Sequence, residues 1–429
     1  MRILSVQALR GANFWSTINT KLIQVRLDID FNVYNNTKSL ALLNKVSFLT
    51  VDFQKEIEST KTTEELFAKI CLCLQSLAHS RVDFFAVKKT IYPTIYNVVF
   101  EYAYEEAGIK AAYAAEKILQ HLLQKKSLDY ELEINQIKKI VNAVKPNETI
   151  SNLLHQANKN NIPVLLPSDE NKLQFGYGKN GIELNSTTDV NSILSLFLTN
   201  RKWRIPIIAI TGSNGKTTTT RLIAHIIKLS NVKVGFTTSD GIYVDEKMID
   251  EGDTTGPISA ATVLRNKEVE FAVLETARGG IVRAGLGFDV CDIAVVTNVQ
   301  DDHLGISDIE TLEDLAKVKG VVVNSVKKNG VAILNADNIY TKNLGEQANC
   351  KVSWFSLDKN NSVFKNKKYN GNAFAFINNN KIIVQKGEDI IIEIDLADVP
   401  ITFNGTLKFM TENVLAATLA CYNYGIDSN

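Results

Sequence analysis

The residues of this chain best suited to chemistry lie in a glycine-rich stretch, ITGSNGKTTTT, at positions 210–220. An apolar run, residues 207–210, leads into the glycines, and a helical pattern of apolar residues follows them. Glycines let backbone N–H groups close around phosphate oxygens, and the start of a helix adds partial positive charge. Lys216 would then reach the terminal phosphates, and Thr217 would hold Mg²⁺. The stretch therefore predicts a site for Mg-ATP.

This loop is a variant of the general phosphate-binding pattern G-x-x-x-x-G-K-[ST]. That pattern places a glycine where this chain has Ile210, and the chain has Gly212 instead. A P-loop NTPase motor or switch is therefore the weaker interpretation of the stretch.

Polar side chains follow two later apolar runs, where strands of a parallel sheet would end. Glu275 and Asn298 each come directly after such a run, and Asp302 and His303 follow shortly. Ligands gather at the carboxyl ends of parallel strands. Oxygen atoms of Thr217 and Glu275, with a nitrogen of His303, would suit Mg²⁺ that bridges ATP and a substrate carboxylate. Each residue alone is more often structural, but their combination behind one phosphate loop favours a function.

Two arginines lie in a glycine-rich segment, ETARGGIVRAGLG, that begins at Glu275. Arginine can grip a carboxylate with two parallel hydrogen bonds, and glycines permit close backbone approach. A surface loop with stray charges is the alternative. The position next to Glu275 favours contact of Arg278 and Arg283 with an acid substrate.

The elements that must position these residues alternate between strands and helices. Strands are expected at 207–210, 232–237, 271–274, 293–296, 331–334 and 352–355, and helices at 217–229, 258–265 and 311–327. Thr311 and Asp314 have the capping-box spacing that marks the start of the last helix. An asparagine-rich turn between 373–377 and 382–384 predicts a β-hairpin. The alternation predicts an α/β fold with a mostly parallel sheet covered by helices on both faces.

The chain before this sheet divides into two regions. Residues 1–160 combine strand candidates at 3–6 and 22–27 with amphipathic helices, and they predict an α+β domain. Residues 161–203 are rich in Asn, Ser, Thr and Gly, which indicates a linker. The expected domains are therefore 1–160, 161–203 and 204–429.

Composition limits the partners and the compartment. Lys plus Arg and Asp plus Glu are 47 each in 429 residues, so no overall field favours nucleic acid or an anionic membrane. Five scattered cysteines without C-x-x-C spacing indicate reduced thiols. The N-terminal apolar stretch is too short for a secretion signal, and no run reaches membrane-spanning length. A cytoplasmic protein is expected.

Several motifs resemble the Mur ligase superfamily, whose members use ATP to join amino acids to carboxylates. Positions 212–217, GSNGKT, look like its ATP loop. Segments that resemble its cyanophycin synthetase group are TSDGIY at 238–243, ETARGG at 275–280, GLGFD at 285–289 and DHLG at 302–305. LRGANFW at 9–15 and FEYAYEEAG at 100–108 resemble the N-terminal domain of that group. On its residues alone, the first of these is only a glycine turn with an aromatic anchor.

The resemblance implies a role for individual residues. The residues of the ATP loop would be Gly212, Ser213, Asn214, Gly215, Lys216, Thr217 and Thr218. Asn298 and Asn413 match nucleotide-site asparagines, and Glu275 and His303 would complete the Mg²⁺ site. Lys319 matches a lysine that many members carbamylate to place a second Mg²⁺.

The resemblance is incomplete in two places. The cyanophycin synthetase group has an ATP-grasp module between its N-terminal domain and its Mur-like part. Here residues 172–180 resemble only the start of that module, so 161–203 would be its vestige. In that group the module adds aspartate and the Mur-like part adds arginine, so synthesis of the complete polymer is not expected. The chain also stops where a C-terminal Mur lobe is expected to begin.

The leading hypothesis is an ATP-dependent carboxylate–amine ligase that forms an amide or peptide bond through an acyl phosphate. Its partners would be an amino acid and a peptide or polymer acid, with ATP and Mg²⁺ as cofactors, and a homo-oligomer is compatible with this activity. The alternative is a non-catalytic ATP-binding partner or regulatory subunit of a peptide or polymer ligase.

Overall fold

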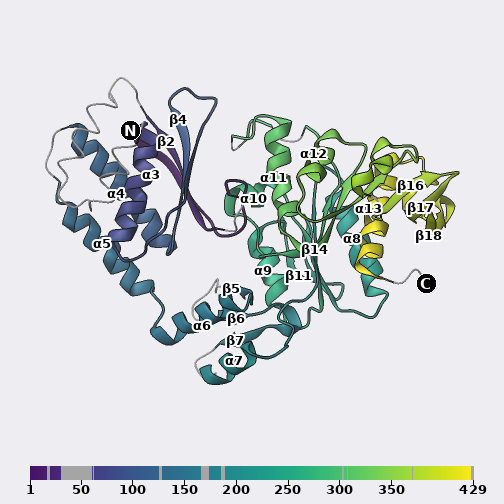
Figure 1. Cartoon of the computed structure of the whole chain (residues 1–429), viewed down its shortest axis with the longest axis horizontal. Helices are drawn as coiled ribbons and strands as arrows, with labels where there is room; N and C mark the ends of the chain where they lie inside the picture. Colours follow the sequence, from purple (N-terminus) through teal and green to yellow (C-terminus); the bar gives the residue numbers. More distant parts are fainter. Residues whose placement is uncertain are drawn as a thin grey trace. The chain divides into compact units, whose positions relative to one another are not determined.

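The computed structural model describes residues 1–16, 20–29, 60, 62–124, 128–165, 173–184, 189–301, 304–306, 308–369 and 371–426. The chain folds as two compact units, and many of their helices and strands are labelled in Figure 1. The first unit comprises residues 1–10 and 18–147. The second comprises residues 148–429 together with the short segment 11–17.

The first unit is an α+β module built on a four-stranded antiparallel sheet in the order β1-β2-β4-β3. Its elements are β1 (Arg2–Leu9), β2 (Leu22–Asp28), α3 (Thr63–Leu77), β3 (Phe85–Lys89), β4 (Ile95–Glu101), α4 (Glu105–Leu123) and α5 (Tyr130–Val144). Helices α3 and α4 pack on the sheet, and α5 packs on α4. The predicted amphipathic helices are present, and apolar residues of α3 and α4, among them Leu66, Ile70, Ala111 and Ile118, are buried in this core.

Residues 148–205 form a small packed region of the second unit. Its elements are α6 (Glu148–Lys159), β5 (Val164–Leu165), β6 (Leu173–Phe175), η1 (Gly178–Asn180), β7 (Ile182–Leu184) and α7 (Val190–Phe197). The three strands form an antiparallel sheet. Phe197 packs edge to face on Phe175 and on Trp203, with ring centroids 5.3 and 5.4 Å apart. The stretch that reads as a linker therefore contributes to a hydrophobic core.

An eleven-stranded sheet organises the rest of the second unit, in the order β11-β10-β9-β12-β8-β13-β14-β15-β16-β17-β18. The strands from β9 to β16 in this order pair in parallel, and the two outer strands on each side are antiparallel. The strands are β8 (Ile207–Thr211), β9 (Val234–Thr237), β10 (Gly241–Val244), β11 (Lys247–Glu251), β12 (Phe271–Glu275), β13 (Cys291–Val296), β14 (Val326–Asn335), β15 (Lys351–Ser356), β16 (Ala373–Asn378), β17 (Lys381–Lys386) and β18 (Asp389–Asp395).

Helices cover both faces of this sheet (Figure 1). Helices α8 (Lys216–Lys228) and α13 (Lys408–Tyr424) lie on one face. The other face carries α9 (Pro257–Arg265), α10 (Arg278–Ala284), α11 (Leu312–Asn324) and α12 (Ile339–Gln347). Short 3₁₀ turns complete the fold: η2 (Ser362–Lys365), η3 (Lys367–Tyr369), η4 (Leu396–Asp398) and η5 (Pro400–Thr402).

The packing of the central strand β8 explains why its first four residues are apolar. Ile208 and Ile210 belong to the core under α8 and α13, whereas Ile207 and Ala209 belong to the core on the opposite face. A strand of a parallel sheet that is covered on both faces must be apolar on both. The predicted mostly parallel sheet with two helical layers is confirmed.

Two local predictions are also confirmed. Thr311 caps α11, because its hydroxyl accepts a hydrogen bond of 3.1 Å from the N–H of Asp314. Strands β16 and β17 form the predicted hairpin, in which Asn379 and Asn380 adopt φ values of 50° and 60°. Asparagine tolerates this left-handed region better than most residues.

None of the described helices combines the length and the apolar character that a membrane span requires.

The small core of residues 148–205 can be tested with Phe175→Ala. Phe175 is fully buried, so its truncation leaves a cavity that we expect to lower the free energy of unfolding by about 3–5 kcal/mol. A urea titration followed by tryptophan emission measures this change. Leu198→Ala is the control, because Leu198 is 82% exposed and its loss should cost less than about 0.5 kcal/mol. Equal effects of the two substitutions would contradict a packed core.

Candidate active site

The glycine loop joins β8 to α8 at the carboxyl edge of the large sheet. Gly215 precedes the first residue of α8 and has a φ of 84°, and none of the described side chains caps this helix. The N–H groups of the first turn are thus free of a side-chain acceptor and suit an anion. The Lys216 ammonium donates a hydrogen bond of 3.0 Å to the backbone oxygen of Ser213, which folds its side chain over the loop.

Asn298, which follows β13, stabilises the conformation of the glycine loop through hydrogen bonds. Its side-chain oxygen accepts a hydrogen bond of 3.0 Å from the N–H of Asn214, and its amide nitrogen donates one of 3.1 Å to the oxygen of Asn214. The Thr297 hydroxyl donates to the same oxygen at 2.6 Å. Ser213 is fixed too, since its hydroxyl donates to the backbone oxygen of Gln300 at 2.9 Å. The loop is therefore ordered by the neighbouring strand.

Glu275 and Thr217 lie together beside the loop. The Thr217 hydroxyl donates a hydrogen bond of 2.8 Å to the Glu275 carboxylate, which is 3% exposed. Burial, with a smaller contribution from Asp253, raises the pKa of Glu275 above its ordinary value. The hydrogen bond from Thr217 and the charge of Lys216 act in the opposite direction without cancelling the shift. A cation beside this carboxylate would relieve the unfavourable burial of its charge.

Ser239 is a residue of this site that the sequence analysis did not assign a role. Its hydroxyl lies 3.2 Å from the Thr217 hydroxyl, and its backbone N–H bonds to Glu275. Ser239 follows β9 at the same edge of the sheet. A hydroxyl residue directly after a predicted parallel strand is the sequence feature that could have identified it. Three oxygen-bearing side chains thus meet at one point.

His303 and Lys319 are the other residues that the sequence predicts at the metal site. His303 lies outside the described residues, as does Asp302. Among the residues that are described, no group of three or more His, Cys, Asp or Glu side chains is arranged to hold a metal. Lys319 is buried on α11 with 1% exposure, which is unusual for a lysine.

Arg278 and Arg283 lie on α10, which begins three residues after Glu275. Arg278 donates a hydrogen bond of 3.2 Å to the backbone oxygen of Ile306, and Arg283 is exposed. The helix packs closely on the segment before α9: a side chain at Gly280 would lie 3.0 Å from the Cα of Gly256. The same segment includes Thr255, whose oxygen accepts from the N–H of Ala277 at 3.2 Å.

A residue in the first half of α13, Asn413, also contacts the glycine loop. Asn413 is 4% exposed, and its side-chain amide packs on Gly215 so closely that any side chain there would overlap it. The preceding residue, Glu412, has a pKa raised to about 6 by burial and by the nearby charge of Asp337. A hydrogen bond from Asn335 opposes this rise. These acidic and amide groups were not singled out from the sequence, except for Asn413.

The residues present fit Mg-ATP. The uncapped start of α8 provides N–H groups and partial positive charge for phosphate oxygens. The Thr217 hydroxyl and the Glu275 carboxylate, one hydrogen bond apart, are the hard oxygen ligands that Mg²⁺ prefers. Lys216 adds a positive charge at the same place.

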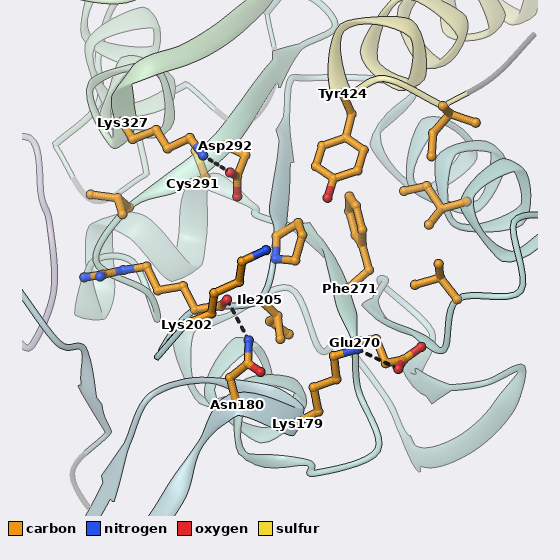
Figure 2. Close-up of a pocket in the computed structure, with 16 residues that line it drawn as sticks. Lys179, Asn180, Lys202, Ile205, Glu270, Phe271, Cys291, Asp292, Lys327 and Tyr424 are labelled. Atoms are coloured by element: carbon orange, nitrogen blue, oxygen red, sulfur yellow. Dashed lines mark hydrogen bonds and ion pairs between the residues drawn. The ribbon is translucent and has the colours of Figure 1, made fainter. Parts of the chain in front are cut away.

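A cavity of about 480 Å³ lies at the opposite edge of the sheet, where β8, β12 and β13 begin. Figure 2 shows two ion pairs among the residues that line it, Lys327 with Asp292, and Lys179 with Glu270 at 2.8 Å. Asn180 donates to the backbone oxygen of Arg204 at 2.9 Å. This cavity is remote from the glycine loop in the sheet and is not the candidate site.

Comparison with known protein families finds two matches along this chain. Residues 210–421 match the Mur ligase middle domain, a range that begins in β8 and ends in α13. Residues 47–124 match the cyanophycin synthase-like N-terminal domain. The chain therefore combines a cyanophycin synthase-like N-terminal domain with a Mur ligase middle domain.

Its relatives include cyanophycin synthetases. The enzyme of Geminocystis herdmanii is 45% identical over 54% of this chain and 26% of its own length. That of Crocosphaera subtropica is 46% identical over 52% of this chain and 26% of its own length. The chain thus spans about a quarter of the length of these relatives.

More distant relatives belong to other ligases. A UDP-N-acetylmuramoylalanine--D-glutamate ligase of Caldanaerobacter subterraneus is 30% identical over 52% of this chain and 42% of its own. A solved UDP-N-acetylmuramoyl-L-alanyl-D-glutamate--2,6-diaminopimelate ligase aligns at 23% identity over 56% of this chain and 47% of its own, with a TM-score of 0.39. The assignment rests on the sequence matches.

The support of the loop by Asn298 can be tested with Asn298→Ala. Two hydrogen bonds to the backbone of Asn214 are lost, and each unsatisfied buried group costs about 1–3 kcal/mol. We expect the affinity for Mg-ATP, measured by calorimetric titration, to fall about tenfold or more. Asn372→Ala removes an amide that donates to Val352 elsewhere in the same sheet, and it should leave the affinity unchanged. Similar losses in both variants would contradict the assignment.

Glu412 predicts a pH dependence of stability. Its folded-state pKa of about 6 exceeds the ordinary value of 4.5, so its contribution to stability is complete below the ordinary value and disappears as pH rises through about 6. We expect the wild type to lose more unfolding free energy between pH 5 and pH 7.5 than Glu412→Gln, by roughly 1 kcal/mol after allowance for solvent screening. Urea titrations at both pH values measure this difference. The control is Glu388→Gln at an exposed position, and a wild-type curve that matches Glu412→Gln would refute the prediction.

Proposed function

We propose that this protein is an ATP-dependent carboxylate–amine ligase of the Mur ligase type. The observation that carries the proposal is the meeting of the uncapped glycine loop with the buried Glu275–Thr217 pair at one edge of the sheet. The arginine-bearing helix α10 begins at that same edge. Phosphate, metal and carboxylate binding groups would thus serve a single reaction. The identities of the relatives as amide-forming ligases agree with this chemistry.

The reaction has two steps. A carboxylate oxygen of the acid attacks the γ-phosphorus of ATP, and the bond between that phosphorus and the β-phosphate oxygen breaks. The products of this step are ADP, which departs, and an acyl phosphate. The nitrogen of an amine then attacks the acyl carbon, inorganic phosphate leaves, and the amine loses its proton to solvent or to that phosphate. The chain has little covalent work to do, so positioning and charge stabilisation carry the rate.

Lys216 and the start of α8 have the central part in this mechanism. The Lys216 ammonium would neutralise charge that spreads over the γ-phosphoryl oxygens, and within the loop of residues 212–218 the N–H groups at the start of α8 would hold the phosphates. Asn298 and Asn413 would keep the loop in place from two sides. Displacement in line with the acid requires this fixed geometry.

Thr217, Glu275 and His303 would hold the metal. Bound Mg²⁺ supplies neutralisation of phosphate charge and orientation of the reacting oxygens. Glu275 is suited to this role because its burial makes an adjacent cation favourable. Lys319, buried on α11, would be carbamylated and so acquire the negative charge that a second metal ion needs.

The substrates follow from the arginines and from the relatives. Arg278 and Arg283 would bind the acid, since a guanidinium matches a carboxylate with two hydrogen bonds. The related ligases are named for cyanophycin and for amino-acid addition, so an amino acid is proposed as the amine and an amino-acid or peptide derivative as the acid. All five cysteines are free thiols, which agrees with a reducing cytoplasm.

The test is phosphate release from Mg-ATP with and without pooled aspartyl peptides and amino acids. We expect release to require both acid and amine, and Lys216→Ala to lower it by about 100-fold or more without unfolding the protein. Circular dichroism and thermal melting check the fold of the variant. Near-normal product formation by Lys216→Ala would reject the ligase assignment. Binding of ATP with no release in any mixture would favour a non-catalytic partner or regulatory subunit.

A further inference from the structure

The segment that follows β1 has a structural role that its sequence does not reveal. Arg10 belongs to the first unit, but residues 11–17 belong to the second. Two backbone hydrogen bonds fasten this segment to the end of α10: the N–H of Gly11 donates to Ala284 at 3.3 Å, and the N–H of Leu286 donates to Ala12 at 2.9 Å. The segment therefore pairs with the chain on both sides of Gly285.

Glycines make this close pairing feasible. A side chain at Gly11 would overlap the backbone oxygen of Leu286. A side chain at Gly285 would lie 2.6 Å from the oxygen of Gly11, and the φ of Gly285 is 79°, a value that favours glycine. The two backbones approach so closely that a methyl group on either must displace the other.

Asn13 fixes the shape of the segment. It is 3% exposed, its amide nitrogen donates to the oxygen of Gly11 at 3.1 Å, and its side-chain oxygen accepts from the N–H of Trp15 at 3.0 Å. Phe14 packs against the core beneath α9, α10 and α11 and lies 5.2 Å from the Trp15 ring. The segment is thus an ordered turn with its own anchor in the second unit.

This turn determines where α10 can lie. The helix has only seven residues, too few to hold its own position without tertiary contacts. On one side it packs on Thr255 and Gly256, and at its carboxyl end it is held by Gly11 and Ala12. Displacement of that end would move Arg283 first, and then Arg278 at the other end of the helix.

We propose that the segment Gly11–Ser16 is a positioning element of the acid-binding part of the active site. It holds the carboxyl end of α10 and thereby sets the place of Arg278 and Arg283 relative to the glycine loop. This inference rests on the proposed function, because it assigns the acid to these arginines. The residues of the segment act through α10, and the glycine loop has its own support from Asn298.

The experiment is Gly11→Ala, studied by steady-state phosphate release with the aspartyl-peptide pool as the acid. We expect the KM for the acid to rise about tenfold or more, as displacement of a binding group by an ångström suffices for such a loss. The KM for ATP should remain within about twofold, because the loop is supported separately. Asn13→Ala removes the shape of the turn without any overlap, so it should raise the same KM even if Gly11→Ala folds poorly.

The matched control is Gly387→Ala. Gly387 lies in the turn between β17 and β18 with a φ of 63°, and an added methyl group there meets open space. This variant strains the backbone through the positive φ of Gly387, away from α10, so it reports a loss of stability without an overlap at α10. We expect it to leave the KM for the acid unchanged.

Hydrogen exchange gives a second readout that needs no turnover. In Gly11→Ala and Asn13→Ala the amides of residues 278–286 should exchange faster, whereas those of residues 212–220 should keep the wild-type rate. An unchanged acid KM, unchanged exchange at 278–286, or an equal rise of both KM values overturns the positioning role in an active enzyme. If the wild type releases no phosphate with any acid, the proposed function fails instead, and the acid-positioning role is rejected with it.

Discussion

Burial of β8 on both faces of the large sheet is the constraint on which the candidate site depends. Because the strand is covered by α8 and α13 on one face and by the helices of the other face, its residues 207–210 are apolar on both faces. Polar chemistry is therefore displaced to the point where the strand ends. The parallel neighbours β12 and β13 end at the same edge, and they bring Glu275 and Asn298 beside the loop. The site follows from the direction of the strands.

Glycines that permit close contacts are the second feature on which the structure of this unit depends. Gly215 leaves room for the amide of Asn413, Gly280 for the segment before α9, and Gly11 with Gly285 for each other. In each case the absent side chain lets another part of the chain approach the backbone of the glycine closely. The loop and α10 are short elements, and such contacts give them the rigidity that they lack on their own.

The electrostatics of the site are unfavourable in the protein alone. Glu275 and Glu412 both have raised pKa values, and burial is the largest cause for each. Glu275 accepts a hydrogen bond from Thr217 of the glycine loop, and Glu412 directly precedes Asn413, which packs on Gly215. Such groups are found where a cation or a ligand is to be bound, since the ligand restores the free energy that burial costs.

The sequence by itself determined the loop, the strand ends and the layers of the sheet. Local patterns predicted these features, because each depends on residues that are neighbours in the chain. Examples are the strand Ile207–Thr211 followed by glycines and a helix, the alternation of later strands and helices, and the helix start capped by Thr311. The position of Glu275 at the same edge followed from the rule for parallel strands. The hydrogen bond between Glu275 and Thr217 agrees with it.

Only the tertiary structure decided three other features. Residues 161–203 look like a polar linker in the sequence. Their scattered apolar residues, such as Phe175 and Trp203, nevertheless form a hydrophobic core together with residues of α6 and α7. Ser239 reaches Thr217 through the pairing of β9 with β12. Gly11 contacts Leu286 although their residue numbers differ by 275. Contacts of this kind depend on how distant segments pack, and packing leaves no periodic signal in either segment alone.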